Sequence, residues 1–407
     1  MTDDAMSDLT DTFADAMARL GPFGAAPRLA VAVSGGADST ALALLARNWA
    51  ERHHGSILAL IVDHGLRGES ANEAVLTAAH LQAHGIAGKI LTISGLSGPA
   101  IQEKARAARY EALAEAAMED GRLHLLLGHH AADQSETVAM RLARGTLGAE
   151  GIAAWTARRK ILLLRPLLNI QPATLRDYLT AAGMEWVEDP SNENRKFERV
   201  RIRQAGTALL PAGAEARRAR EQEAAEFLAR HATIRPEGFA LIDAPAAPQA
   251  ALGALIRAIG GADYPPRAKA AAMLAARLRP ATLGGVRILP AGRLGPGWLL
   301  VREAAACAPP VSARRNTSWD RRFILDATPL PAQTFGGLKA ASHKFKKFNG
   351  LPDIVLRAMP CLRTEDGEII FPVAARFAPP APVTSHPFLS QGQLICAAMG
   401  NQCRMTI

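Results

Sequence analysis

The sequence is poor in the residues that build disulfides and metal clusters. Of its 407 residues only four are cysteine, and all lie in the last quarter of the chain: Cys307, Cys361, Cys396 and Cys403. They share no C-x-x-C spacing and have no histidine at zinc-ligand spacing, so we expect free thiols in a reducing compartment. No run of about 18 apolar residues would span a bilayer, and the acidic N-terminus lacks the basic segment of a signal peptide. We therefore predict a cytoplasmic protein.

Acidic residues are scarce in the second half of the chain. Residues 1–210 hold 22 Lys+Arg and 24 Asp+Glu, whereas residues 211–407 hold 25 and 14, so the two parts carry −2 and +11 of the net charge of +9. A basic second half predicts a polyanionic partner, although an arginine-rich bias of the whole proteome would give the same balance. With 49% hydrophobic residues, the chain is long enough for two or three domains with cores of their own.

Apolar runs alternate with helical stretches in the first part of the chain. The runs cover residues 28–33, 57–63, 89–94, 123–129 and 161–166. This alternation predicts right-handed βαβ units, and hence an α/β fold with a parallel sheet covered by helices on both faces. Beyond residue 205 the sequence changes to Ala- and Arg-rich helices and a hairpin-like pair, and a Pro-containing linker at 306–316 follows. We predict an α/β domain at 1–208, a helical middle domain at 209–307 and a small mixed C-terminal domain at 308–407.

The segment S-G-G-A-D-S at residues 34–39 joins a predicted strand to a predicted helix. It has no lysine to close a Walker loop and does not fit the G-x-G-x-x-G pattern of dinucleotide-binding turns. Backbone N–H groups and the positive end of a helix dipole still meet at such a turn, which makes it an anion site. A carboxylate beside a phosphate is repulsive without a cation between them, so Asp38 indicates Mg²⁺ if the ligand is a nucleotide. The alternative is that Asp38 or Ser39 only caps the helix.

The loop resembles the S-G-G-x-D-S signature of the PP-loop ATP pyrophosphatases, which bind ATP and release pyrophosphate by adenylating a substrate oxygen. Six further motifs follow in order: VDHGLRGES (62–70), IQEKARAARYEAL (101–113), GHHAADQSET (128–137), RLARGTLGAEGI (141–152), LRPLL (164–168) and WVEDPSNENRKFERVRIR (186–203). This ordered set closely resembles the tRNA(Ile)-lysidine synthase family. The resemblance implies an adenine nucleotide alpha hydrolase-like PP-loop fold for residues 1–208, followed by domains that recognise tRNA.

Members of that family adenylate the C2 oxygen of the wobble cytidine in isoleucine tRNA with a CAU anticodon, and the ε-amine of free lysine then displaces AMP. The resemblance implies the same activity here. It also implies ATP as co-substrate, Mg²⁺ as cofactor, and free lysine and this tRNA as partners. The sequence leaves open whether the protein forms a homodimer and how the methionine tRNA with the same anticodon is excluded.

In an open α/β sheet, ligands bind beyond the carboxyl ends of the strands. Ser34, Asp63–His64 and His129–His130 fall at three such ends, so we expect them to line one crevice. The predicted ATP-binding residues are Ser34, Gly35, Gly36, Ala37, Asp38, Ser39, Asp63, His64, Gly128 and His129. For Asp63 and His64 the alternative is a buried pair at a strand end that satisfies turn amides.

The predicted catalytic residues are Asp38, two further carboxylates and two arginines. Asp133 and Glu136 lie three apart at a helix start, where they could bind Mg²⁺ or hold the incoming ammonium and accept its proton. An N-cap and N3 pair is the structural alternative. Arg106 and Arg109 lie three apart on one helical turn. They can neutralise charge on the α-phosphate and pyrophosphate or hold the carboxylate of lysine, unless they form a solvated helix face.

A dense basic segment follows the predicted sheet. Five basic residues within nine positions predict contacts to RNA phosphates, namely Arg195, Lys196, Arg199, Arg201 and Arg203. Family members often have Asn where this chain has Val200. The basic, glycine-punctuated stretch at 141–152 suits a loop that closes over the substrate, or a helix that ends at Gly145.

Two segments of the last domain combine basic and aromatic residues. Trp319 lies within 314–322, and Phe345 and Phe348 lie within 342–350. This mixture is typical of surfaces that contact phosphates and stack on exposed bases, and the alternative is a solvated turn.

Other functions of related proteins fit the sequence less well. A tRNA thiolation enzyme of the same superfamily needs a sulfur-carrying cysteine or a cluster-ligating set, and no cysteine precedes Cys307. Amide-forming synthetases usually receive ammonia from a glutaminase with a nucleophilic cysteine, and we identify no such domain. A non-catalytic tRNA- or nucleotide-binding relative would be expected to lose Asp38, Asp133 or Glu136 first, and all three are present.

Overall fold

The computed structural model describes residues 3–63, 65, 70–95, 101–143, 151–158, 161–187 and 214–379, with three short strands beyond residue 387. The chain forms two compact units, one of residues 1–156 and 160–217 and the other of residues 157–159 and 218–407. No helix among the described residues is long and apolar enough to cross a membrane. The boundary predicted at 307/308 stays a prediction.

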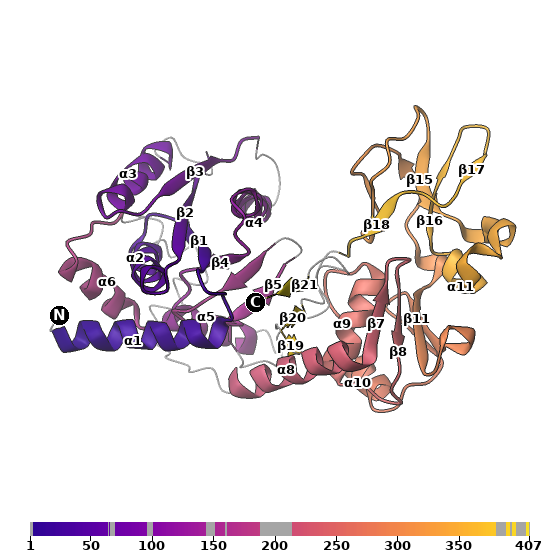
Figure 1. Cartoon of the computed structure of the whole chain (residues 1–407), viewed down its shortest axis with the longest axis horizontal. Helices are drawn as coiled ribbons and strands as arrows, with labels where there is room; N and C mark the ends of the chain where they lie inside the picture. Colours follow the sequence, from indigo (N-terminus) through magenta and orange to yellow (C-terminus); the bar gives the residue numbers. More distant parts are fainter. Residues whose placement is uncertain are drawn as a thin grey trace. The chain divides into compact units, whose positions relative to one another are not determined.

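The first unit is built on a six-stranded sheet with the order β3-β2-β1-β4-β6-β5 (Figure 1). Its strands are β1 (Arg28–Val33), β2 (Ser56–Asp63), β3 (Gly88–Thr92), β4 (His124–Leu126), β5 (Trp155–Ala157) and β6 (Leu162–Leu164). The pairs β1–β2, β2–β3, β1–β4 and β4–β6 are all parallel. The predicted α/β fold with a parallel sheet is therefore confirmed, and only the three-residue β5 was not predicted.

Among the described residues of the first unit, six helices accompany the sheet. They are α1 (Asp3–Leu20), α2 (Ala37–Arg52), α3 (Ser70–Ala83), α4 (Ile101–Glu119), α5 (Ala131–Ala143) and α6 (Pro172–Ala181). Figure 1 shows α2 and α4 on opposite sides of the sheet. Leu113 and Ala117 of α4 pack with Ala30 and Leu60 in one core cluster. Strands covered on both faces read as continuous apolar runs, which is why the sequence located them well.

One histidine lies in the core of this unit. His124, the first residue of β4, is 9% exposed, and its ring meets the ring of Phe23 edge-on at a centroid distance of 5.0 Å. Burial lowers the pKa of His124 to about 4, because the charged imidazolium loses its hydration there. His124 is therefore neutral at pH 7.

The second unit begins with helices and an antiparallel sheet of order β7-β8-β11-β10-β9. The helices are α8 (Ala214–His231), α9 (Gln249–Gly260) and α10 (Ala268–Ala275). The strands are β7 (Ala232–Arg235), β8 (Phe239–Ile242), β9 (Ala281–Leu283), β10 (Val286–Pro290) and β11 (Trp298–Arg302). The predicted helices and the β10–β11 hairpin are present, and three more strands extend the hairpin into a sheet.

The last part of the chain is small and rich in strands, as predicted. It contains β12 (Val311–Ser312), β13 (Ser318–Trp319), β14 (Phe323–Leu325), β15 (Thr334–Gly337), α11 (Asp353–Leu356), β16 (Pro360–Arg363), β17 (Ile369–Ile370) and β18 (Ala375–Phe377). Further strands are β19 (Phe388–Ser390), β20 (Gln393–Ile395) and β21 (Arg404–Thr406). Cys307 and Cys361 are free and buried, and Cys396 and Cys403 lie outside the described residues.

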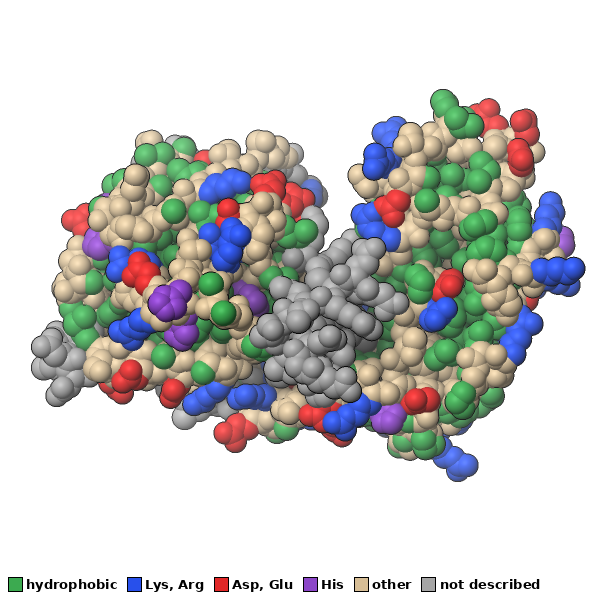
Figure 2. Space-filling model, viewed as in Figure 1, with side chains coloured by type: hydrophobic (Ala, Val, Ile, Leu, Met, Phe, Trp, Pro, Cys, Tyr) green, Lys and Arg blue, Asp and Glu red, His purple; other side chains and the backbone are tan. Residues whose placement is uncertain are grey.

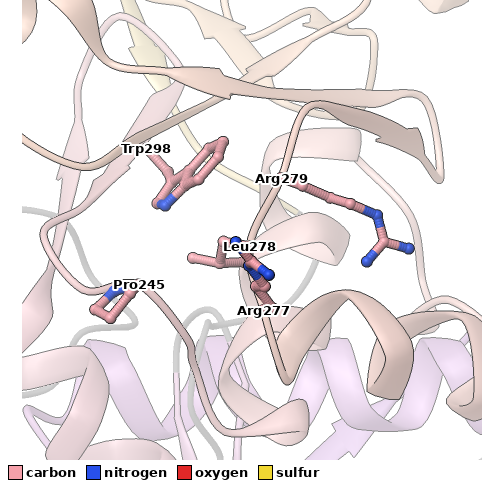
Figure 3. A pocket seen from close by; sticks show the side chains of 5 residues that line it. All are labelled: Pro245, Arg277, Leu278, Arg279 and Trp298. Atoms are coloured by element: carbon pink, nitrogen blue, oxygen red, sulfur yellow. The ribbon is translucent and has the colours of Figure 1, made fainter.

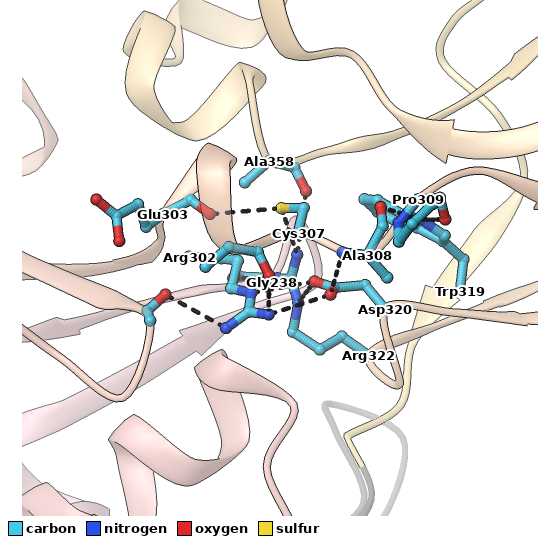
Figure 4. Close-up of polar contacts among 12 residues, drawn as sticks. Gly238, Arg302, Glu303, Cys307, Ala308, Pro309, Trp319, Asp320, Arg322 and Ala358 are labelled. Atoms are coloured by element: carbon cyan, nitrogen blue, oxygen red, sulfur yellow. Dashed lines mark hydrogen bonds and ion pairs between the residues drawn. The ribbon is translucent and has the colours of Figure 1, made fainter.

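The segment 306–316, which the sequence predicts as a linker, packs against the neighbouring residues and is not an extended connection. A carboxylate oxygen of Asp320 accepts the N–H of Ala308 at 2.8 Å and also pairs with Arg302 of β11 at 3.2 Å. The other oxygen of Asp320 accepts Nε of Arg322 at 2.7 Å, and Arg322 is fully buried (Figure 4). One buried carboxylate thus serves two arginines, which joins the end of the β-sheet to the following segment.

The prediction that Trp319 stacks on exposed bases is wrong. Trp319 is 0% exposed, and its indole N–H donates to the carbonyls of Ala308 and Pro309 at 3.3 and 3.1 Å. Phe345 and Phe348 pack on Phe371 at centroid distances of 5.0 and 4.7 Å, so these rings serve a core as well. The aromatic residues are core residues because a small strand-rich domain must bury its few large side chains.

The basic residues beside these rings remain on the surface. Lys344, Lys346 and Lys347 are exposed. Figure 2 shows Lys and Arg side chains gathered at the edge of the second unit that carries α11. The phosphate-contacting part of the prediction for residues 342–350 therefore stays open.

Candidate nucleotide-binding and catalytic site

The S-G-G-A-D-S loop follows β1 directly and leads into α2. Gly36 is the N-cap, with φ −70° and ψ 160°, and α2 begins at Ala37. The prediction that Asp38 or Ser39 caps this helix is therefore wrong, because both lie inside its first turn. The hydroxyl of Ser39 instead accepts the N–H of Ser34 at 3.1 Å and donates to the carbonyl of Gly36 at 3.0 Å, so it closes the loop from within.

The two glycines of the loop have different surroundings. Gly35 has φ +89°, and a Cβ there would lie 2.6 Å from Oγ1 of Thr77 on α3, so no larger residue fits. A Cβ on Gly36 would meet only Oγ of Ser34, at 3.9 Å. The space in front of Gly36, at the N-terminus of α2, is where an anion can approach the backbone N–H groups.

The end of β4 lies against this loop. A Cβ on Gly128 would come within 3.2 Å of Cα of Ser39, so Gly128 allows the two segments to touch. Nε2 of His130 lies 3.2 Å from Oδ2 of Asp38. The side chain of His130 is 6% exposed and that of Asp38 is 33% exposed. Two of the three predicted strand ends are therefore brought together.

His130 is the residue that the sequence singled out least. The sequence places it at a strand end, but the predicted ATP-binding and catalytic residues do not include it. Two adjacent histidines lie after β4. The pattern of strands and helices in the sequence does not tell which of the two side chains points toward the loop at residues 34–39. The contact with Asp38 identifies His130, and Nε2 of the same ring lies 3.7 Å from Oδ2 of Asp133.

The two carboxylates of α5 have different roles in the helix start. Oδ2 of Asp133 accepts the backbone N–H of His130 at 3.0 Å, which is the N3 half of a capping box. Asp133 thus holds the N3 position that the structural alternative had given to Glu136. Glu136 is 3% exposed, so it lies inside the unit.

The side-chain amide of Gln134 is hydrogen-bonded to both backbone groups of Ile152.

Asp63 ends β2 and is 7% exposed. Its Oδ1 accepts the N–H of Gly65 at 2.9 Å and the hydroxyl of Ser70 at 2.5 Å. These are the turn contacts that the structural alternative for Asp63 predicts. His64 lies outside the described residues.

Arg106 and Arg109 lie on the same face of α4, as predicted. Their guanidinium carbons lie 5.3 and 5.6 Å from the ring centre of Tyr110, which packs against the core beneath α4. No carboxylate in the described part of the chain lies within ion-pair distance of either arginine. A planar guanidinium held on a ring and without a carboxylate partner is suited to bind an anion.

The acidic residues fit a magnesium ion that is bound together with a phosphate. Among the described residues, no group of three or more His, Cys, Asp or Glu side chains forms a metal cluster. Oδ1 of Asp38 is buried and has no hydrogen-bond partner there. Mg²⁺ is commonly held by one or two protein carboxylates and by substrate phosphates, which matches a single carboxylate oxygen beside the loop.

Val187, the last described residue before the segment with the predicted tRNA contacts, is hydrogen-bonded to the S-G-G-A-D-S loop. The N–H of Val187 donates to the carbonyl of Gly35 at 2.9 Å. The residues that follow lie outside the described part of the chain, and with them all five predicted tRNA-binding residues, namely Arg195, Lys196, Arg199, Arg201 and Arg203. Residues 144–150, the core of the predicted closing loop, lie outside it too.

Comparison with known proteins decides the family. The model of the PP-loop domain matches residues 7–210. The tRNA(Ile)-lysidine synthase of Ruegeria pomeroyi is 37% identical over 344 residues, which cover 78% of this chain and 81% of that protein. This chain belongs to the tRNA(Ile)-lysidine synthase family.

Two more relatives extend the match. The tRNA(Ile)-lysidine synthase of Rhizobium meliloti is 37% identical, and the alignment covers 73% of each chain. That of Caulobacter vibrioides is 32% identical, with 86% of this chain and 87% of the relative covered. The similarity to the family therefore extends beyond the PP-loop domain into the second unit.

Proposed function

We propose that this enzyme joins free lysine to C2 of the wobble cytidine in isoleucine tRNA with a CAU anticodon, with an adenylated tRNA as intermediate. The products are lysidine in the tRNA, AMP and pyrophosphate. The observation that carries the proposal is the contact between Asp38 and His130, 3.2 Å apart. It joins the PP-loop to the start of α5, which carries Asp133, and this supports a phosphate site and a carboxylate at the same edge of the sheet.

In the first step the C2 oxygen of cytidine attacks the α-phosphorus of ATP, and pyrophosphate leaves. The loop at 34–39 binds phosphate oxygens through backbone N–H groups and the dipole of α2. Asp38 would hold Mg²⁺, which neutralises the phosphates when bound. His130, itself buried, fixes the orientation of the Asp38 carboxylate.

In the second step the ε-nitrogen of lysine attacks C2, and AMP leaves with the former C2 oxygen. The ε-ammonium must lose a proton before it can attack, so a carboxylate has to bind the cation and accept that proton. Asp133 and Glu136 are the candidates on α5. Arg106 and Arg109 supply the positive charge, either for the phosphates or for the carboxylate of lysine.

A thiolation enzyme is disfavoured by the two cysteines in the described part of the chain. Burial raises the pKa of the Cys307 thiol and of the Cys361 thiol, which keeps both in the unreactive protonated form. A non-catalytic relative is disfavoured because the sequence has all three carboxylates that such a relative would be expected to lose first, namely Asp38, Asp133 and Glu136.

The experiment measures pyrophosphate release from ATP with isoleucine tRNA carrying the CAU anticodon, with and without lysine. We expect release to require this tRNA, and lysine to appear in the tRNA in equal amount. Release that is indifferent to tRNA, or incorporation of ammonia in place of lysine, would refute the proposal.

A further inference from the structure

The second unit has an open hollow that the proposed function does not use. Its volume is about 590 Å³, and its lining is made by Pro245, Arg277, Leu278, Arg279 and Trp298 (Figure 3). Small-molecule sites commonly measure about 300–1,000 Å³, so the space is large enough for one nucleotide.

The walls of the hollow are fixed by the fold. Leu278 is 3% exposed and belongs to the core beneath the sheet, and Trp298 packs against that core from β11. The N–H of Leu278 donates to the carbonyl of Pro245 at 3.0 Å. Arg277 and Arg279 flank the anchored Leu278, and both are exposed. The hollow is therefore preformed, which reduces the entropy lost when a ligand binds.

Basic residues outnumber acidic ones in the segment that forms the hollow. Residues 243–300 contain seven Lys+Arg and two acidic residues, Asp243 and Asp263. Asp243 is paired with His231, and Asp263 is paired with Arg321. In the described part of the chain, no carboxylate lies within ion-pair distance of Arg277 or Arg279. Two arginines and an indole ring that line one hollow suit an anion that also carries a flat apolar surface.

We propose that this hollow binds one unpaired nucleotide of the tRNA, with the base stacked on Trp298 and the adjoining phosphates bound by Arg277 and Arg279. The inference rests on the proposed function for the identity of the RNA. Among the described residues that line the hollow there is no amide, carboxylate or hydroxyl side chain, and we assign its two arginines to phosphates and not to a base edge. A stacking contact on Trp298 accepts any base, so we expect the site to select a single-stranded, accessible nucleotide and not a particular base.

The first test replaces the stacking ring. Trp298→Leu is expected to weaken the binding of a short oligouridylate by about 5- to 150-fold, the range for the loss of one base–aromatic stack. Trp298→Phe keeps an aromatic surface and should retain most of the affinity. The same Leu variant should raise KM for tRNA in lysidine formation. Thermal unfolding of both variants checks that the core at Leu278 is intact.

The second test replaces the charges. Arg277→Ala/Arg279→Ala should reduce the slope of log K against log salt by about 1.4, because each phosphate contact on a single strand contributes about 0.7. Arg287→Ala is the matched control. Arg287 is exposed and lies opposite Val301 in the β10–β11 register, so both side chains are on the same face of the sheet. Val301 and Trp298 belong to the clusters on opposite faces of the sheet, and Arg287 is therefore an arginine on the face away from the hollow.

Three outcomes would overturn the inference. Trp298→Leu could bind oligouridylate as tightly as the unchanged protein. Arg287→Ala could lower the salt slope as much per charge as the double variant. A glutamate-rich peptide of equal charge could displace oligouridylate equally well, which would show attraction by charge alone. Oligouridylate binding is measured without catalysis, so a protein that failed to form lysidine would refute the proposed function without deciding this site.

Discussion

Oδ2 of Asp38 lies 3.2 Å from Nε2 of His130, and this contact joins the first turn of α2 to the residue that precedes α5. Oδ1 of the same carboxylate is buried and has no hydrogen-bond partner among the described residues. One oxygen of Asp38 is thus paired with His130, and we predict that the other binds a ligand.

Replacing either partner of this contact should affect adenylation to different degrees. Asp38→Ala is expected to abolish pyrophosphate release, because the predicted ligand of the cation is gone. His130→Ala should lower the rate about 10- to 100-fold, the usual effect of losing a residue that orients a metal-binding side chain. Steady-state pyrophosphate release with saturating tRNA measures both. If His130→Ala released pyrophosphate as fast as the unchanged protein, His130 would not be needed to orient Asp38.

The basic segment should bind tRNA and not ATP. Arg199→Ala/Arg203→Ala is expected to weaken tRNA binding and to lower its salt slope by about 1.4–1.8, since two phosphate contacts are lost. Filter binding over a range of salt concentrations measures this, and KM for ATP is the control. An unchanged salt slope would show that these arginines do not contact RNA phosphates.

Breaking the buried ion network of the second unit should cost much stability. Asp320→Asn leaves Arg302 and Arg322 without their shared carboxylate, which is expected to lower the free energy of unfolding by about 3–5 kcal/mol. Asp263→Asn is the matched control, because Asp263 pairs with Arg321 at the surface and the expected loss is at most about 1 kcal/mol. Urea denaturation compares the two. If Asp320→Asn and Asp263→Asn lowered the free energy of unfolding equally, the burial of the network would not contribute to stability.

His124 should make the first unit sensitive to acid. Its pKa is about 4 in the folded chain and 6.5 when exposed, so the unfolded state binds the proton more readily. The contribution of neutral His124 is present above pH 6.5 and is lost as the pH falls toward 4. By pH 4.5 the loss amounts to about 2–3 kcal/mol.

The check compares the free energy of unfolding at pH 7 and pH 4.5 for the unchanged protein and His124→Gln, which cannot titrate. The variant should lose less stability over this range. An identical loss in both proteins would assign the acid sensitivity to carboxylates elsewhere.

The sequence predicted those parts of the fold in which local pattern and burial agree. The strands that end at Val33 and Asp63 are apolar throughout because both faces of the sheet are covered, and the glycine turn after Val33 is visible in the residues alone. The N-cap of α2 was misplaced because Gly, Asp and Ser can all precede a helix, and only the backbone angles distinguish them.

Other features depend on contacts that a local pattern does not contain. Trp319 lies between basic residues and looks like a surface residue, yet it is buried because Ala308 and Pro309 fold back over its indole N–H. His130 was not distinguished from His129, since only the position of Asp38 in space separates them. The site was therefore predictable as a set of strand ends, and the contacts within it were not.

The core beneath β8 and β11 limits how the chain can be truncated and how its last segment can be exchanged between relatives. Phe239, Leu299 and Val301 of the sheet share one cluster with Leu338 and Leu356 from the last part of the chain. A chain shortened at residue 307 would expose that face of the sheet to water and would tend to aggregate. Swapping the last segment between relatives should succeed only when the residues facing it on β8 and β11 are exchanged with it.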